Sequence, residues 1–167
     1  LKREVILDIL MLGVFYTLRI AGGAAAAGIA LSVWLAAFSL FFFLALAAVK
    51  RQAELVDAAA RGKLDASGRG YRTGDVALVA AMAVASGYVS VLVLALYLNS
   101  PDVLALYRTP EMLWGLCLVL LYWIGRVVMV AHRGRMHDDP VVFALRDRTS
   151  RACLALVLAL VLAGTLL

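Results

Sequence analysis

The sequence has few of the residues from which catalytic and metal centres are commonly built. Only two cysteines and two histidines occur among its 167 residues, and no CxxC, HExxH, GxSxG, Walker A or GxGxxG pattern is present. Both cysteines, Cys117 and Cys153, lie inside apolar segments, which indicates buried thiols and no disulfide framework. These absences argue against a zinc protein, a serine or cysteine hydrolase, a P-loop enzyme and a dinucleotide-binding domain.

Charged residues are also scarce. They make up 16% of the chain, whereas 65% is hydrophobic and the mean hydropathy is +0.96. Because a soluble domain is usually about a quarter charged, this composition predicts a membrane protein. The net charge of +5 then matters through its position in the chain, and it indicates no nucleic-acid partner. The first apolar run contains Asp8 and Arg19 and lacks a cleavage pattern, so no signal peptide is expected.

Five apolar segments are long enough to cross a hydrocarbon core of about 30 Å as helices. They are 5–21, 29–49, 76–98, 112–131 and 152–167. We therefore expect an all-α fold, a polytopic membrane helix bundle that forms a single transmembrane domain over residues 1–167. With a cytoplasmic N-terminus, the connections on the opposite side contain a single basic residue, Arg108. The positive-inside rule then places the N-terminus and both long basic loops on the inner side of a bacterial-type cytoplasmic membrane.

Charges inside the first apolar segment need an explanation. Arg19 follows Asp8 by eleven residues, about three helical turns, so both side chains lie on one face, and Tyr16 neighbours Arg19. A charge at membrane depth is costly and usually faces a cavity or the bundle interior. Either Asp8 has a functional role or it lies shallowly in the membrane, whereas Arg19 is expected to extend to the interface.

The second apolar segment ends in the sequence "VKRQAELVDAAAR", which contains no helix breaker before Gly62. The helix is therefore expected to continue beyond the membrane, with Lys50, Glu54, Asp57 and Arg61 along one stripe. Two carboxylates at this spacing can hold Mg²⁺ together with water and substrate phosphates, and neighbouring basic groups can bind those phosphates. The alternative is a solvated helix whose ion pairs only anchor it at the interface.

The two long loops contain further candidates. The first, "RGKLDASGRGYRTGD" (61–75), is Gly-rich and basic, which fits either a phosphate-contacting loop around Tyr71 or a flexible connector. In the second (132–151), Pro140 predicts the start of a short helix with Asp139 as its N-cap. That helix presents Asp147 between two arginines.

The series "LKR…YTLRIAGGAA…VKRQAEL…ALRDR" resembles the second half of a UbiA-type polyprenyl transferase, over nearly the whole chain. It is most similar to decaprenyl-phosphate phosphoribosyltransferases. The resemblance implies helices five to nine of a nine-helix membrane fold with a cavity open to lipid. Members use Mg²⁺ to transfer a group from a phosphorylated donor, here phosphoribosyl diphosphate or prenyl diphosphate, to a polyprenyl phosphate or another acceptor.

The family's first Asp-rich motif, "NDxxDxxxD", does not occur in this sequence, and residue 1 is Leu. We therefore expect helices one to four to precede this chain or to come from an equivalent subunit, and the 167 residues alone to be inactive. Lys50 falls about where ordinary prenyltransferases have the first aspartate of their second motif. This departure favours the phosphoribosyl branch.

The resemblance also implies roles for individual residues. Lys50, Arg51 and Glu54 are the expected catalytic residues. Lys50 and Arg51 are expected to hold phosphate oxygens of the departing diphosphate, and Glu54 to hold Mg²⁺ through water or to orient a cation. The metal candidates are Glu54 and Asp57. The candidates for substrate binding are Lys2, at the end of a "YxxLKR" signature, with Asp8, Tyr16, Tyr71 and Asp147. The expected partners are a diphosphate-containing donor, a polyprenyl lipid and the surrounding membrane lipids.

Two other classes compete with a transferase. In a transporter-like bundle, Asp8, Arg19 and Arg126 would line a polar pathway through the membrane. The charges gather on one side of the membrane instead, and no inverted repeat is visible. A non-catalytic membrane scaffold is also compatible with this sequence.

Overall fold

The computed structural model describes residues 4–29, 32–63, 70–136 and 139–166, and no strand occurs in these ranges. Its long helices are α1 (Leu7–Ala26), α2 (Val33–Ala60), α3 (Val76–Leu98), α5 (Trp114–His132) and α7 (Arg148–Leu166). Shorter helical pieces connect them, namely η1 (Thr73–Asp75), α4 (Pro101–Leu106), η2 (Pro110–Leu113) and α6 (Pro140–Arg146). Within these described ranges, five helices are long and apolar enough to cross a membrane, which confirms the predicted all-α membrane bundle.

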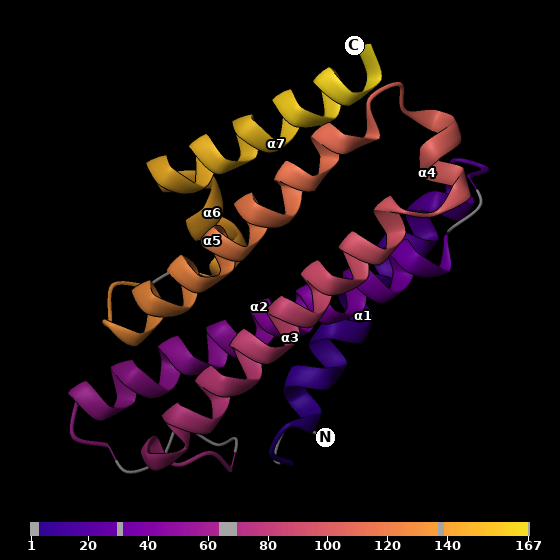
Figure 1. The fold of residues 1–167 in the computed structure, drawn as a ribbon. Coiled ribbons are helices and arrows are strands. Elements are labelled where there is room, and N and C mark those ends of the chain that lie inside the picture. The colour runs from indigo at the N-terminus through magenta and orange to yellow at the C-terminus, as the bar shows by residue number, and fades with distance from the viewer. Residues whose placement is uncertain (1–3, 30–31, 64–69, 137–138, 167) are drawn as a thin grey trace.

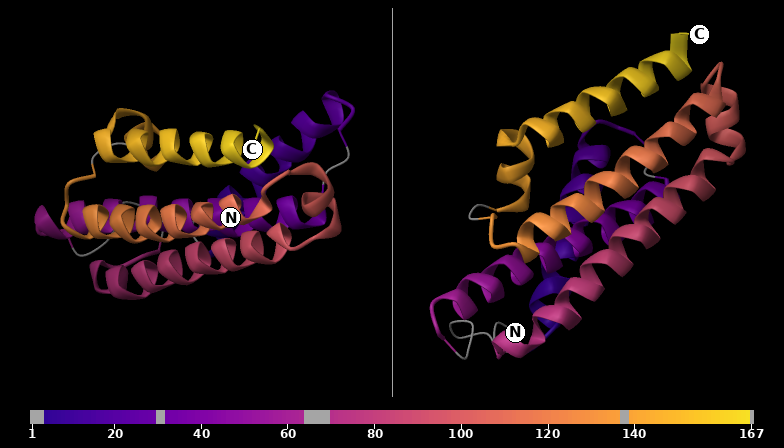
Figure 2. Two further views of the ribbon diagram at one scale, coloured as in Figure 1. Left: turned by 45° about the horizontal axis from the view of Figure 1, so that its top comes forward. Right: turned by 60° about the vertical axis from the view of Figure 1, so that its left-hand side comes forward.

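Helix α2 lies at the centre of the bundle. It packs against α1, α3, α5 and α6, whereas α7 packs against α5, α6 and η2 (Figure 1). Figure 2 shows α7 on the outer side of α5, with α6 beside its N-terminal end. The long helices α1, α3 and α5 therefore all pack against the helix that contains the "VKRQAEL" sequence.

Small residues allow the helices to approach closely. A Cβ on Gly87 of α3 would lie 2.5 Å from Cγ2 of Ile124 on α5, and a Cβ on Gly13 would lie 3.2 Å from the backbone nitrogen of Leu44 on α2. Such close contacts between small and large residues are typical of packed membrane helices. They hold α1, α3 and α5 around the centre of the bundle.

The first helix is longer than the predicted apolar segment 5–21 and extends into the following sequence "GGAAAAG" (22–28). Helix α1 continues through it to Ala26, because alanine has the highest helix propensity and sustains the helix past two glycines. A Cβ on Gly22 or Gly23 would meet no described atom within 4 Å, so these glycines make no close helix contact.

Two predicted helix boundaries are confirmed. Helix α2 runs to Ala60, and it is followed by Gly62 at a φ of +68°, the left-handed conformation that glycine adopts past helix ends. The carboxylate of Asp139 accepts a hydrogen bond of 3.1 Å from the Val141 N–H at the start of α6, as the N-cap prediction required. Both elements border the site described below.

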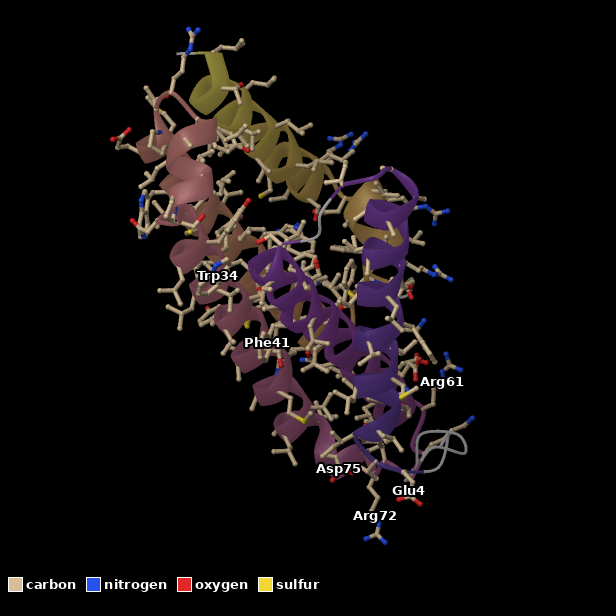
Figure 3. The ribbon with its side chains drawn as sticks, turned by 90° about the vertical axis from the view of Figure 1, so that its right-hand side faces the viewer. Glu4, Trp34, Phe41, Arg61, Arg72 and Asp75 are labelled. Atoms are coloured by element: carbon tan, nitrogen blue, oxygen red, sulfur yellow. The ribbon has the colours of Figure 1, made fainter. Side chains whose placement is uncertain are left out.

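Charged side chains gather where α2 ends and α3 begins. Figure 3 shows Glu4, Arg61, Arg72 and Asp75 at this end of the molecule. The exposed turn after α5 adds Arg133 to the same end, because α5 runs back along α3. The polar groups therefore concentrate where the second half of α2 extends.

Candidate functional site

A polar cavity of about 200 Å³ lies beside the last three turns of α2, next to the segment that leads into α6. The residues that line it are Lys50, Ala53, Glu54, Asp57, Arg61, Met136 and Asp139. The stripe predicted from helical spacing thus forms one wall of this cavity, and the sequence before α6 forms the other. Positively and negatively charged side chains therefore face the same cavity.

The two walls are joined by an ion pair. Nζ of Lys50 donates a hydrogen bond of 2.7 Å to Oδ2 of Asp139. Burial raises the pKa of Asp139, but the hydrogen bonds from Lys50 and from the Val141 N–H outweigh it and hold the pKa below its usual value. The Lys50 side chain remains 40% exposed, so its ammonium group is accessible to a ligand in the cavity.

The predicted metal residues are both engaged by arginines. Asp57 pairs with Arg61 at 2.6 Å near the cavity mouth, and Glu54 pairs with Arg51. In the part of the chain that the structure describes, no three His, Cys, Asp or Glu side chains come together as a metal site. Mg²⁺ at this wall therefore needs further oxygen ligands, which substrate phosphates can supply.

A buried network lies behind the cavity wall. Arg51, with 2% of its side chain exposed, forms ion pairs with Asp8 of α1 and Glu54 of α2. Its guanidinium carbon lies 5.3 Å from the centroid of the Tyr71 ring. The Tyr71 hydroxyl donates a hydrogen bond of 2.8 Å to Oδ1 of Asp8 and accepts one of 2.7 Å from the Ile6 N–H. This network joins α1, α2 and the segment before α3.

This geometry places three predicted site residues in the interior. The two terminal nitrogens of Arg51 face carboxylates, and the residues that line the polar cavity do not include Arg51. Asp8 is the second residue of α1, near the charged end of the bundle, and its 12% exposed side chain is paired there, so a shallow position and an inward-facing one coincide. The roles of Arg51, Asp8 and Tyr71 towards a substrate stay predictions. The contacts favour positioning of Glu54 by Arg51.

Tyr16 borders the site from α1. Its ring stacks on Phe43 with the centroids 5.0 Å apart, and the Arg19 guanidinium lies 5.6 Å from the Tyr16 centroid, as the predicted neighbourhood required. Tyr16 also lines a small cavity of about 30 Å³ together with Lys50 and Asp139. It is therefore the predicted site residue on α1 that shares a space with Lys50.

Asp147 lies in a different cluster, between α6 and α7. Arg126 donates hydrogen bonds of 2.7 and 3.1 Å to its two carboxylate oxygens, and the Ser150 N–H donates one of 2.8 Å. Burial raises the pKa of Asp147, but these hydrogen bonds hold it below its usual value. The structure therefore does not bring Asp147 to the polar cavity. Lys2 lies outside the described residues.

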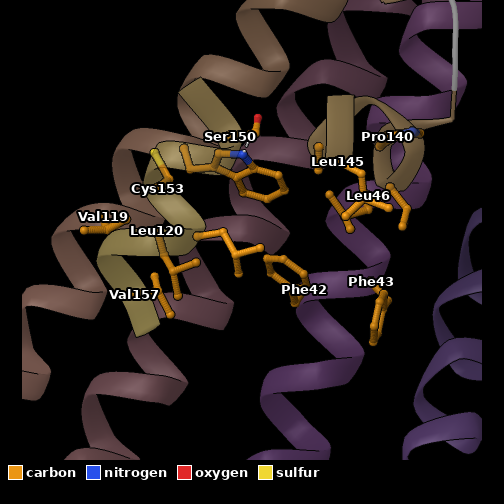
Figure 4. Close-up of a pocket in the computed structure, with 14 residues that line it drawn as sticks. Phe42, Phe43, Leu46, Val119, Leu120, Pro140, Leu145, Ser150, Cys153 and Val157 are labelled. Carbon is orange, nitrogen blue, oxygen red and sulfur yellow. Dashed lines mark hydrogen bonds between the residues drawn. The ribbon is translucent and has the colours of Figure 1, made fainter. Parts of the chain in front are cut away.

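An apolar cavity of about 290 Å³ lies between α2, α5, α6 and α7 (Figure 4). Its walls are Phe42, Phe43, Leu46, Val119, Leu120, Trp123, Pro140, Val141, Ala144, Leu145, Ser150, Cys153, Leu154 and Val157. The small cavity beside Tyr16 shares Leu46 and Val141 with this apolar space, and it shares Lys50 and Asp139 with the polar cavity. Polar and apolar spaces thus adjoin along α2.

Sequence reasoning missed the partner of Lys50 and the residues that line the apolar cavity. Asp139 was expected only as a helix cap, and it lies 89 residues after Lys50 in the chain, beyond the reach of any helical spacing rule. The apolar cavity depends on where α6 and α7 pack against α2 and α5, which no local pattern encodes. Helix-cap chemistry before Pro140 was the one local signal near Asp139.

Tyr71 provides a prediction for alkaline pH. Its burial, reinforced by the hydrogen bond to Asp8, raises its pKa to about 12. Because the pKa in the unfolded chain is about 10, this group's contribution to stability is complete below pH ~10. The contribution is lost as the pH rises from about 10 to about 12.

The measurement is the tyrosinate absorbance of the wild type minus that of Tyr71→Phe across this pH range. We expect a single difference step with a midpoint at about pH 12. A midpoint at the ordinary tyrosine value of about 10 would contradict the buried position of the hydroxyl.

Comparison with known proteins finds two longer bacterial relatives. The chain is 40% identical over 151 residues to the uncharacterized protein y4nM of Sinorhizobium fredii, a match that covers 90% of this chain and 29% of that protein. It is 38% identical over 164 residues to the nodulation protein NoeC of Azorhizobium caulinodans, with 96% of this chain and 52% of that protein covered. No protein-family model and no solved structure matches the chain. It thus spans about half of one relative and less than a third of the other.

Proposed function

We propose that this chain belongs to a membrane-embedded transferase of the UbiA type, which moves a group from a phosphorylated donor to a lipid acceptor. The observation that carries the proposal is the junction of the two cavities along α2. The polar one is lined by Lys50 and Arg61, and the apolar one begins a turn away at Leu46. Adjoining spaces of this kind suit a reaction between a phosphate-bearing group and an isoprenoid lipid.

The preferred substrates are phosphoribosyl diphosphate as the donor and a polyprenyl phosphate as the acceptor. Lysine binds phosphate as a compact point charge, and Lys50 offers two N–H donors beyond the one directed at Asp139. Arg61, at the cavity mouth, can exchange its carboxylate partner for phosphate oxygens because both side chains of that pair are exposed. Prenyl diphosphate is the second candidate donor.

Catalysis on this proposal is electrostatic. Mg²⁺, when bound, neutralises charge on the departing diphosphate, and Glu54 and Asp57 would hold it together with substrate oxygens. Lys50 stabilises the same developing charge from the cavity wall. Arg51 keeps the Glu54 carboxylate at the cavity through their ion pair, so we assign it a positioning role.

We place the polar cavity on the cytoplasmic side of a bacterial cytoplasmic membrane. The basic residues at the ends of α2 and α5 support this orientation, since such residues remain on the inner side. The transporter alternative is less consistent with the contacts, because Asp8 pairs with Arg51 whereas Arg126 pairs with Asp147. Two of its three expected pathway charges are therefore held in separate clusters.

The proposal is tested with the complete protein in its native membrane. We expect Mg²⁺-dependent appearance of a lipid-linked phosphoribose from radiolabelled phosphoribosyl diphosphate and decaprenyl phosphate, separated by thin-layer chromatography. Chelation by EDTA is expected to lower the rate at least about tenfold, and added Mg²⁺ to restore it. If neither phosphoribosyl diphosphate nor a prenyl diphosphate is consumed, the transferase proposal is wrong and the interpretation as a non-catalytic scaffold replaces it.

A further inference from the structure

Asp139 connects the polar cavity to a wall of the apolar one. Its carboxylate pairs with Lys50 across the polar cavity and also caps the first turn of α6. Pro140, Val141 and Leu145 of that helix line the apolar cavity. Figure 4 shows Pro140 and Leu145 on α6, across from Phe42 of α2. The carboxylate of Asp139 thus links this apolar wall to α2, in addition to the direct packing of α6 on α2.

A polyanion in the polar cavity acts on this carboxylate in two ways. It attracts the Lys50 ammonium, which is the hydrogen-bond partner of Asp139, and it repels Asp139, which lines the same cavity. The Lys50 and Asp139 side chains are 40% and 29% exposed, and ion pairs with that much access to water are weak and exchange readily. Helix α6 has only seven residues, so a shift of its first turn has to overcome mainly the packing of the buried Pro140 and of Phe143 and Ala144.

We propose that Asp139 is a positioning residue that couples the two cavities. The Lys50–Asp139 pair holds α6 against the apolar cavity, and a diphosphate bound at Lys50 releases α6 and opens that cavity to the lipid tail. The inference depends on the proposed function for the presence of a diphosphate and an isoprenoid lipid. It adds an order to the reaction, because the diphosphate donor then binds before the lipid acceptor.

Cys153 provides the readout, because it lines the apolar cavity opposite α6. The complete protein is reconstituted in nanodiscs and treated with N-ethylmaleimide, and alkylation of the peptide that contains Cys153 is followed by mass spectrometry. In the wild type we expect magnesium pyrophosphate to raise the alkylation rate about two- to fivefold, the range set by the free energy of a partly exposed ion pair.

Asp139→Asn separates the two roles of the carboxylate. Asparagine is as good an N-cap as aspartate, so α6 keeps its first turn, but the charge that binds Lys50 is lost. We expect this variant to show the raised rate without pyrophosphate and no further increase with it. Lys50→Met is expected to show the same raised basal rate. The matched control is Glu111→Gln, which removes an exposed carboxylate of η2, the short helix that packs against α7. This variant is expected to behave as the wild type.

Binding of pyrophosphate is measured separately by equilibrium dialysis. Binding without any change in the Cys153 rate overturns the coupling and leaves the proposed function standing. An Asp139→Asn variant that responds to pyrophosphate as the wild type does overturns the coupling as well. Absence of pyrophosphate binding to the complete protein overturns the proposed function and the coupling together.

Discussion

Replacing Arg51 with methionine is expected to lower the free energy of unfolding by about 3–5 kcal/mol, the usual cost of breaking a buried ion pair. Arg51 is 2% exposed, and its removal takes away the cation that pairs with the largely buried carboxylate of Asp8 and also with Glu54. Asp8 is 12% exposed, and among the described residues its remaining partner is the hydroxyl of Tyr71. The measurement is thermal or denaturant-induced unfolding in detergent micelles, followed by circular dichroism.

The matched control for this change is Arg61→Met. It makes the same substitution ten residues later in the sequence and also removes a partner of an aspartate, but the Arg61 and Asp57 side chains are 64% and 48% exposed. An exposed pair contributes only about 0–1 kcal/mol, so we expect a change within that range. Equal losses in the two variants would show that the burial of Arg51 is not what makes its ion pairs important.

Replacing Lys50 with alanine in the complete protein is expected to lower the rate of phosphoribosyl transfer by about two to three orders of magnitude. Removing one preorganised electrostatic group from a transition state typically has an effect of about this size. Among the described residues, Lys50 lines both the polar cavity and the small cavity beside Tyr16, whereas Arg61 lines the polar cavity near its mouth, so we expect Arg61 to replace it poorly. The measurement is the initial rate of lipid-linked product formation, with pyrophosphate affinity determined alongside.

The control for this variant is Lys63→Ala. Lys63 is exposed three residues after the end of α2 and is not among the residues that line the described cavities. We expect it to retain the wild-type rate. If the Lys50→Ala protein folds and transfers the group at the wild-type rate, the polar cavity is not the reaction site.

Local patterns predicted the helices well because burial in a membrane requires apolar runs of a fixed minimum length. The third span, 76–98, coincides with α3 (Val76–Leu98), and the extension of α2 past Lys50 followed from the lack of a breaker before Gly62. The end of α1 was predicted less well. The first span was expected to end at residue 21, but the alanines after the two glycines keep the helix intact to Ala26.

The candidate site was predicted only in part. Helical spacing alone grouped Lys50, Glu54 and Asp57, since residues at i, i+4 and i+7 share a face of any helix. Spacing did not distinguish an exposed basic group from a buried one, so adjacent Lys50 and Arg51 were given the same role. In the fold, Lys50 faces the polar cavity, whereas Arg51 is enclosed by α1 and the segment before α3.

The sequence by itself determined the class of the protein, the number of long helices and the polar stripe on α2, because these depend on composition and on short-range periodicity. The tertiary structure alone decided which charges meet. Asp8 reaches Arg51 across 43 residues and Lys50 reaches Asp139 across 89. Contacts at such separations depend on how whole helices pack, and that packing also creates the apolar cavity beside Leu46. The physical reason is that burial and long-range charge pairing are properties of the assembled bundle, whereas helix formation is local.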